Sequence, residues 1–384
     1  MRFPEFSGEW ERDSLMNIAS ISKGSGISKE QLSDSGLPCI LYGELYTKYK
    51  SEVITDIYSK TDIETKGLVS SMANDVIIPC SGEAAIEIAT ARCVPMSYIL
   101  LGGDLNIIRL NGHDGRFFAY QLNGKRKIDI AKVAQGVSVV HLYGEHLKKI
   151  NVVYPSFAEQ NKIAQLLSLI DERIVTQNKI IEKLESLIKG ICNKLLFADN
   201  GKPVRLIDIL TERTEKTKEN NQHEVLSSTV KGIFSQREYF SKDIASENNI
   251  GYKIIRLYDI VLSPQNLWMG NINYNEKFKV GIVSPSYKIF SIKAEFDKRF
   301  VAFMLKTHRA LYNYMLVSEQ GASVVRRNLN MEAFEQLVFK MPPYNKQREI
   351  GKTLSLLQTR LELESKIKLN YEQQKKHLLT EMFI

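Results

Sequence analysis

The sequence predicts an α+β chain with two mixed α/β globular regions, each followed by a long helix that pairs with the other in an antiparallel coiled coil. Three observations predict this internal pseudo-two-fold arrangement. A segment near the middle recurs at the end, an apolar heptad pattern begins within each copy, and short apolar runs precede each one. The 384 residues are enough for two or three domains of roughly 150 residues.

The first globular region is expected at residues 1–155. It contains short apolar runs bounded by glycine, asparagine and serine, which are typical of strands. We expect strands at Val76–Ile78, Leu105–Leu110 and Ile150–Val153. The apolar spacing of Phe117–Leu122 predicts a helix.

Residues 156–199 predict the first long helix. From Ile163 onward, apolar residues recur alternately every four and three positions, a period of 3.5 that indicates a coiled coil. Ser156 and Glu159 have the spacing of a capping box at its start, and Gly201 ends it. The expected seam consists of Ile163, Leu167, Ile170, Ile174, Gln177, Ile181, Leu184 and Ile188.

The second globular region is expected at residues 200–342 and echoes the first. Strands are expected at Ile260–Leu262 and Lys288–Ile292, and a helical stretch at Arg299–Leu316. Leu15–Ile18 in the first region resembles Leu206–Ile209 in the second. These echoes indicate one module written twice.

Residues 343–384 predict the second long helix, which repeats the first at an offset of 187 residues, so that Gln177 corresponds to Glu364. We expect the two helices to pair antiparallel, because an isolated long helix is marginally stable. The alternative is that each seam packs on its own globular region. The second seam consists of Ile350, Leu354, Leu357, Leu361, Glu364 and Tyr371.

The loops between the repeated anchors differ. Gln135–Val140 matches Gln320–Val325, whereas Tyr42–Lys50 and Cys80–Glu83 have no counterpart in Ser263–Asn271. A shared scaffold with unlike loops favours two binding sites for different targets. Neutral drift of surface loops is the alternative.

The charge balance permits a nucleic-acid partner: 52 Lys and Arg against 44 Asp and Glu give a net charge of +8. Arginine reads guanine edges, asparagine and glutamine read adenine, and lysine binds phosphate. The candidate DNA-binding residues are Lys23, Tyr42, Tyr46, Lys48, Ser81, Arg92, Lys125, Ser138, Lys216, Gln265, Asn266, Trp268, Asn271, Ser323, Arg326 and Arg327.

Motifs of catalytic centres are missing from the sequence. It contains no GxxxxGK[ST], GxSxG, HExxH or GxGxxG pattern. Met341–Tyr344 resembles the Asn/Asp-Pro-Pro-Tyr loop of adenine methyltransferases, but Met341 cannot bond the target amino group. We therefore expect no catalytic residue and no metal site.

The four cysteines form no CxxC pair, which argues against a zinc ribbon and fits a reducing compartment. The longest apolar stretch without a charge, Cys93–Gly103, is shorter than the ~18 residues that a membrane span needs. We therefore expect a cytoplasmic protein that has no contact with membranes.

The order of these segments resembles the specificity subunit of type I restriction–modification enzymes. The first globular region leads into Glu159-Gln160-x-x-Ile163, and the second into Gln347-x-x-Ile350. The resemblance covers the whole chain, and the opening residues 2–10 are also similar. The departures are Lys346 at the position of Glu159, and Lys368 and Lys375 within the second seam.

The resemblance implies that each globular region is a target recognition domain for one half of an asymmetric bipartite site in double-stranded DNA. It also implies two modification subunits that use S-adenosylmethionine to methylate adenine, and restriction subunits that use ATP and Mg. The chain itself would be non-catalytic and hold no cofactor. The competing hypotheses are a coiled-coil assembly protein without a DNA role and a self-sufficient methyltransferase or nuclease.

Overall fold

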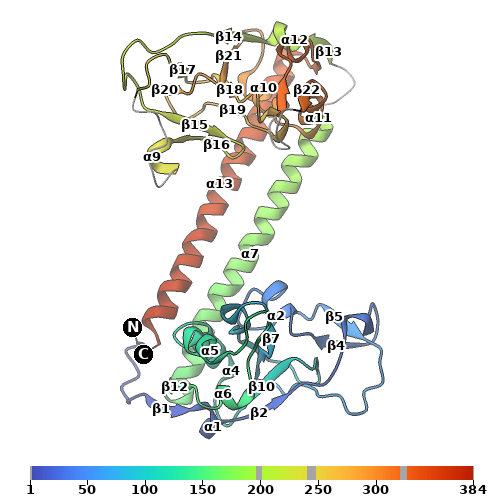
Figure 1. Ribbon diagram of the computed structural model, residues 1–384, viewed down its shortest axis with the longest axis vertical. Coiled ribbons are helices and arrows are strands. Elements are labelled where there is room, and N and C mark those ends of the chain that lie inside the picture. Colours follow the sequence, from blue (N-terminus) through green and yellow to red (C-terminus); the bar gives the residue numbers. More distant parts are fainter. Residues whose placement is uncertain (1, 196–200, 240–247, 321–326, 384) are drawn as a thin grey trace. The chain divides into compact units, whose positions relative to one another are not determined.

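The computed structural model describes residues 2–195, 201–239, 248–320 and 327–383. Contacts within the chain divide it into two compact units. Unit 1 consists of residues 1–179 and 365–384, and unit 2 of residues 180–364. Each unit contains one globular region and parts of both long helices, α7 (Phe157–Leu195) and α13 (Tyr344–Glu381) (Figure 1).

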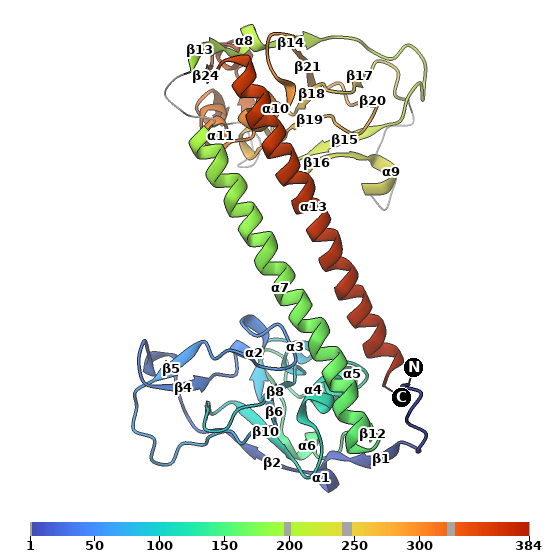
Figure 2. The ribbon, with the colours of Figure 1, turned by 180° about the vertical axis from the view of Figure 1, so that it is seen from behind.

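Unit 1 is built around a four-stranded antiparallel sheet. In spatial order its strands are β2 (Ala19–Lys23), β10 (Leu105–Leu110), β6 (Asp75–Pro79) and β8 (Arg92–Val94). A smaller sheet lies on the side of unit 1 away from α7 (Figures 1 and 2). Its strands are β3 (Leu32–Ser33), β5 (Ser59–Thr61), β4 (Leu37–Ile40) and β9 (Leu100–Leu101).

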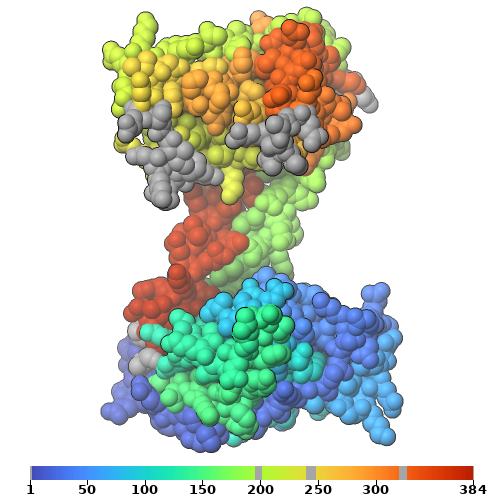
Figure 3. All heavy atoms as spheres, viewed as in Figure 1, coloured from blue at the N-terminus to red at the C-terminus, as the bar shows by residue number. Residues whose placement is uncertain are grey.

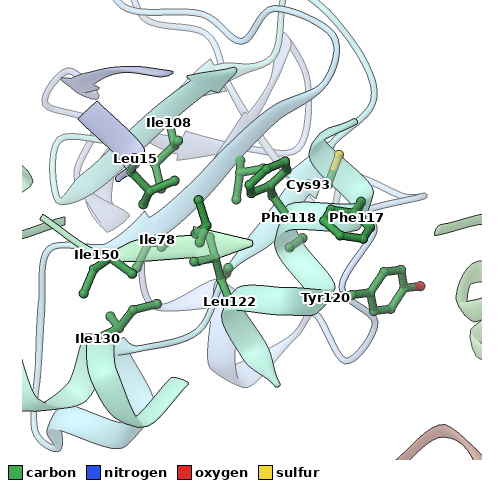
Figure 4. Close-up of a cluster of buried hydrophobic side chains, with 14 of the residues drawn as sticks. Leu15, Ile78, Cys93, Ile108, Phe117, Phe118, Tyr120, Leu122, Ile130 and Ile150 are labelled. Carbon is green, nitrogen blue, oxygen red and sulfur yellow. The ribbon is translucent and has the colours of Figure 1, made fainter. Parts of the chain in front are cut away.

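Helix α4 (Gly115–Asn123) forms the centre of the unit 1 core. Asp114 caps its start, since the Asp114 carboxylate accepts the backbone N–H of Arg116 at 2.9 Å. Its buried aromatic side chains Phe117 and Phe118 pack among residues of the main sheet (Figure 4). Burial of this apolar surface is the main force that holds the helix on the sheet.

The remaining elements of unit 1 are short. They are β1 (Glu11–Ser14), α1 (Leu15–Ile18), η1 (Lys29–Gln31), α2 (Glu44–Thr47), β7 (Ser81–Gly82), α3 (Ala85–Ile88), α5 (Lys127–Val133), β11 (Val140–His141), α6 (Gly144–Leu147) and β12 (Asn151–Tyr154).

Unit 2 repeats the sheet of unit 1, with four antiparallel strands in the equivalent order. These are β14 (Leu210–Arg213), β21 (Lys288–Ile292), β18 (Ile260–Leu262) and β19 (Ile272–Tyr274). A two-stranded pair, β1–β12 in unit 1 and β13–β24 in unit 2, precedes each long helix. The two halves of the chain therefore share one topology.

Unit 2 also has hairpins that unit 1 lacks at the equivalent place, among them β15–β16, on the side away from α11 (Figures 1 and 2). The elements of unit 2 outside the sheet are β13 (Lys202–Arg205), α8 (Leu206–Ile209), β15 (Leu226–Thr229), β16 (Gly232–Ser235), α9 (Gln236–Tyr239), β17 (Lys253–Arg256), η2 (Leu267–Met269), β20 (Val280–Val283), α10 (Lys298–Leu305), α11 (His308–Leu316), β22 (Ser318–Gln320), β23 (Arg327–Leu329), α12 (Met331–Glu335) and β24 (Val338–Met341).

The strands predicted from the sequence coincide with β6, β10, β12, β18 and β21, and the predicted first-region helix with α4. The expected helical stretch Arg299–Leu316 is instead two helices, α10 and α11. Thr307 separates them, because its side chain caps α11 by accepting the Ala310 N–H at 3.3 Å. A threonine is a common residue at the start of a helix, so the sequence contained the information needed to predict two helices here.

The long helices pair within each unit. In unit 1, Ile163 and Leu167 near the start of α7 share a hydrophobic cluster with Leu378 near the end of α13. In unit 2, Ile188 near the end of α7 shares a cluster with Ile350 near the start of α13. Since the start of one helix meets the end of the other, the pairing is antiparallel, as predicted.

The predicted seam positions are buried or half-buried along both helices. The alternative, in which each seam packs on its own globular region, is also true in part, because Ile163 shares a hydrophobic cluster with Phe117 of the first globular region. Gln177 and Glu364 are both buried but belong to different units, so their mutual approach stays a prediction. The domain boundaries also stay predictions, and residues 196–199 lie outside the described residues.

The expected capping box at the start of α7 is wrong. The Glu159 carboxylate accepts two hydrogen bonds from Arg2, at 2.8 Å from Nε and 2.7 Å from Nη2. Glu159 is fully buried, so a charged partner compensates for its loss of hydration better than a backbone N–H would.

Candidate nucleic-acid interface

Three of the predicted DNA-binding residues meet in unit 2. The Arg327 backbone N–H donates to the Gln265 carbonyl at 3.1 Å. The Arg327 guanidinium lies 5.0 Å from the centre of the Trp268 ring, a cation–π contact. Gln265 is exposed and the other two are half-buried. This cluster combines an amide and a guanidinium, the two groups that read adenine and guanine edges.

The loop that carries Gln265 and Trp268 is held firmly. It passes through Asn266 and the short helix η2, and ends at Gly270, whose φ of 94° suits glycine. The Asn266 carbonyl accepts the N–H groups of Met269 at 3.1 Å and Asn271 at 3.2 Å. A closed loop of this kind presents its side chains in a fixed arrangement.

Asn271 does not fit its predicted role in DNA binding. Its side chain is 5% exposed, and its amide nitrogen donates to the Ser228 carbonyl at 3.0 Å. The Ser228 hydroxyl donates to the Asn271 carbonyl oxygen at 2.9 Å. Asn271 therefore attaches the loop to β15 and does not face solvent.

Lys216 belongs to a basic group in unit 2. It is exposed, and its backbone pairs with that of Lys253. Burial, together with the charges of Lys288 and Lys216, lowers the pKa of Lys253. Glu212 partly compensates this charge by pairing with Lys288 at 2.7 Å. A group of lysines that repel one another is suited to phosphate binding.

In unit 1, Tyr42, Tyr46 and Lys48 line a cavity of about 1040 Å³ whose wall also contains Gly102 and Gly103. Burial and the neighbouring Tyr42 raise the pKa of Tyr46, so its phenol stays a hydrogen-bond donor at neutral pH. The Lys48 ammonium donates to Glu44 at 2.6 Å, which reduces its attraction for phosphate. The surface of unit 1 therefore presents two phenol rings, whereas that of unit 2 combines the Trp268 ring with an amide and a guanidinium.

Of the other candidates in unit 1, Lys23 is exposed on β2 and Ser81 is half-buried on β7. Arg92 is only 7% exposed, and its Nη2 donates to the Tyr49 carbonyl at 2.9 Å. Arg92 therefore lies inside the unit, and its predicted contact with a phosphate is inconsistent with its position.

Lys125 and Ser138 are exposed. Ser138 lies in a loop that two hydrogen bonds between Gln135 and His141 close. Gly136 has a φ of 124°, and a Cβ there would lie 2.0 Å from the Val139 carbonyl oxygen, so this turn requires glycine. In Figure 3 residues of this part of the chain, in teal and green, form part of the visible face of unit 1. Ser323 and Arg326 lie outside the described residues.

Sequence reasoning missed a buried charge network in unit 1. The Lys375 ammonium donates to Asp171 at 2.5 Å and to Glu52, and it lies 5.6 Å from the centre of the Tyr120 ring. Burial raises the pKa of Glu52, but the Lys375 charge outweighs it and holds this pKa below its usual value. The position of Lys375 within an apolar seam could have indicated a buried acidic partner.

Two features of the described residues bear on metal and thiol chemistry. These residues contain no group of three or more His, Cys, Asp or Glu side chains that could hold a metal ion. Burial raises the pKa of Cys39 and of Cys80 to about 11, so neither thiol is an activated nucleophile. None of the described helices has the length and apolar character needed to span a bilayer.

Comparison with known proteins decides the family. The family model described as type I restriction modification DNA specificity domain matches residues 7–186 and again residues 202–373. The chain belongs to this family. The specificity subunit is thus a DNA-recognition component of a type I restriction–modification complex, and the alternative of an assembly protein without a DNA role is not favoured.

A relative with the name type I restriction enzyme MjaX specificity subunit, from Methanocaldococcus jannaschii, is 23% identical over 98% of this specificity subunit and 93% of its own length. The S subunit of a type I system from M. genitalium has the same fold, with a TM-score of 0.66, 16% identity and coverage of 100% and 99%. A chain from a study of type I complex assembly and conformational transition reaches a TM-score of 0.51 with 10% identity and 98% coverage of both chains.

Proposed function

We propose that this specificity subunit reads an asymmetric bipartite DNA site, one half with each unit. The observation that carries the proposal is a duplicated sheet and helix frame that bears different residues at the surface of its two copies. Unit 2 groups Gln265, Trp268 and Arg327, and unit 1 places Tyr42 and Tyr46 along a cavity. Different chemistry on one frame suits two different half-sites.

The paired helices act as a spacer between the two half-sites in this proposal. Long helices with a continuous apolar seam are stiff, so they fix a separation along the DNA that no side chain needs to read. Proteins with two equivalent modules meet their half-sites at a separation that the protein frame sets.

The partners supply the chemistry in this proposal. Two modification subunits that bind S-adenosylmethionine methylate adenine, and restriction subunits cleave DNA with ATP and Mg. The chain contributes no catalytic residue and no cofactor, and the complex works in the cytoplasm. Support comes from the duplication, because a partner that binds one copy of the frame has an equivalent frame to bind in the other half of the chain.

Mapping of methylated adenines in cells that express the chain with its modification partner tests the proposal. We expect two unlike short half-sites separated by an unread spacer of constant length. A single continuous motif, or no methylation above cells without the chain, would contradict it. The affinity of the purified complex for DNA should also fall steeply as the salt concentration rises, because each phosphate contact releases about one counterion from the DNA.

The spacer role has its own test. Insertion of four residues beside Gln177 lengthens α7 by about one turn. We expect the methylated sites to acquire a longer spacer while both half-sites keep their sequences. Changed half-sites with an unchanged spacer would count against the helices as the determinant of separation.

A further inference from the structure

One glutamine occupies the same place at the start of each long helix. Gln160 lies in the first turn of α7 and Gln347 in the first turn of α13, and the two are equivalent in the sequence repeat. Their exposed fractions are 1% and 3%. A buried amide must satisfy its hydrogen bonds inside the protein, so its partners reveal what it holds together.

In unit 1 the amide of Gln160 joins three segments. Its Nε2 donates to the Pro155 carbonyl at 2.8 Å, at the end of the last strand of the globular region. Its Oε1 accepts the backbone N–H of Asp114 at 3.1 Å, and Asp114 is the residue that caps α4. Nε2 also lies 3.1 Å from Nδ1 of His113.

In unit 2 the amide of Gln347 makes the same two bonds. Its Nε2 donates to the Pro342 carbonyl at 2.8 Å, and its Oε1 accepts the backbone N–H of Asp297 at 3.0 Å. Asp297 caps α10, the counterpart of α4. The glutamine therefore links the last strand, the long helix and the central helix of each unit.

The surroundings of the two glutamines changed while their bonds did not. The residue before Gln160 is Glu159, which pairs with Arg2, and its counterpart before Gln347 is Lys346, which pairs with the exposed Glu349. Constant bonds in a varied setting indicate that the junction itself depends on this amide.

The contact of each central helix with the long helix is also close. At Gly351 of α13, an added Cβ would lie 2.6 Å from Oδ1 of Asp297 and 2.7 Å from the Phe300 nitrogen. The equivalent residue in α7 is Ala164, which is fully buried. Small residues here let the start of the central helix lie against the long helix, beside the glutamine.

We propose that Gln160 and Gln347 are positioning residues that fix the direction in which each DNA-reading region is held on its long helix. They thereby set the separation of half-sites that the subunit accepts. This inference rests on the proposed reading of a bipartite site.

The two positions differ in how much else supports them. In unit 1, the Tyr120 hydroxyl of α4 donates to Asp171 of α7 at 2.8 Å, and Lys375 joins the same group. The position equivalent to Asp171 is Gln358 in α13, on the wall of a cavity of about 270 Å³. The contact between central helix and long helix therefore depends more on Gln347 in unit 2 than on Gln160 in unit 1.

The experiment uses the full chain in complex with its modification partner. Gln160→Met and Gln347→Met keep the side-chain length but remove both hydrogen bonds. Gln165→Met and Gln373→Met, at exposed positions of the same helices, are matched controls. Binding is measured on duplexes with both half-sites at the native spacer, with one base pair more or fewer, and with each half-site alone.

We expect Gln347→Met to lose about tenfold of its preference for the native spacer, as the loss of two hydrogen bonds allows. Affinity for each single half-site should stay within about twofold, since the reading residues are untouched. Gln160→Met should lose less preference than Gln347→Met, and the controls should match the wild type.

An unchanged spacer preference in both variants would overturn the inference, as would an equal loss on single half-sites. If a Met variant does not fold by circular dichroism, the Gln→Glu variant replaces it, because its carboxylate still accepts the Asp N–H but repels the Pro carbonyl. A wild-type complex without preference for bipartite DNA would instead refute the proposed function, so the two failures are distinguishable.

Discussion

The two units have the same arrangement of sheet and long helix but differ in the ion pairs that stabilise it. Both have the same order of sheet strands and the same glutamine at the start of the long helix. In unit 1, Lys375 adds a buried ion pair between α13 and the globular region, whereas the equivalent position in α7 is Ile188. The difference shows that hydrogen bonds to the backbone define the junction, and that charged braces are local additions.

A turn at the start of β6 in unit 1 and of β18 in unit 2 shows the same pattern of a constant backbone contact and a varied charged partner. Asp75 and Asp259 are buried, and each accepts a backbone N–H three residues earlier. Arg109 of β10, which pairs with β6, binds Asp75, whereas Arg213 of β14, which lies beyond β21 in the sheet, binds Asp259. A buried carboxylate needs a cation, and the two units provide it from different strands of the sheet.

Replacement of Lys375 by Met should have the largest effect on this comparison. It leaves Glu52 and Asp171 buried without their cation, a change that typically costs about 3–5 kcal/mol. Chemical denaturation followed by circular dichroism measures the loss. Lys376→Met, on the exposed side of the same turn, should change stability by less than about 0.5 kcal/mol.

The pH dependence of this variant identifies the cause. Without the cation, burial raises the pKa of both carboxyl groups, so the folded state binds protons more readily than the unfolded state. The deficit of Lys375→Met relative to the wild type should therefore shrink as the pH falls from neutrality. A deficit that stays constant or grows would show that lost packing, rather than the unpaired carboxylates, destabilises the variant.

Replacement of Arg109 and Arg213 by Met sharpens the comparison of the turns. Loss of the partner of a buried carboxylate costs about 1–3 kcal/mol. Arg109 donates two hydrogen bonds to Asp75, at 2.9 and 2.8 Å, whereas Arg213 donates one at 3.0 Å to Asp259. Arg109→Met should thus be the more destabilising in thermal denaturation, and the opposite order would contradict this account.

Alanine replacement of one candidate DNA-reading residue in each unit tests whether the two units read different half-sites. Arg327→Ala should relax one position of one half-site by about 1–3 kcal/mol of discrimination and leave the other half-site unchanged. Tyr46→Ala should affect only the other half-site. Sequencing of methylated sites measures both, and an effect of either variant on both half-sites would break the assignment of one half-site to each unit.

The smallest effect on stability is expected at Glu159 and Lys346, two equivalent positions of the repeat that carry opposite charges. Arg2→Met removes the charged partner of the buried Glu159 and should lower the stability measurably. At the equivalent place in unit 2, Lys346 and Glu349 form an exposed pair, so Lys346→Met should cost less than about 0.5 kcal/mol. Equal losses in urea denaturation would show that the two sites are equivalent after all.

The sequence predicted the features that depend on local pattern. Short apolar runs between turn residues identified β10 and β21, and the 3.5-residue period identified both long helices. The break at Thr307 was also local, but two helices in succession share the apolar spacing of one.

The features that sequence reasoning missed depend on contacts between distant segments. Arg92 is buried because the Tyr49 carbonyl and the charge of Glu52 compensate its guanidinium inside unit 1. The grouping of Trp268 with Arg327 likewise depends on how β23 lies beside the η2 loop. No spacing rule links such pairs, although the repeated glutamines were visible as a constant residue in a changing neighbourhood.

Unit 1 is assembled from the two ends of the polypeptide, whereas unit 2 is one continuous stretch. Phe383 packs against Phe117 with ring centres 5.1 Å apart, so the core of residues 1–179 receives one of its aromatic side chains from a segment more than 180 residues further along the chain. During synthesis, unit 2 is therefore the first to have all of its residues outside the ribosome. Removal of residues 365–384 would therefore damage unit 1 and spare unit 2.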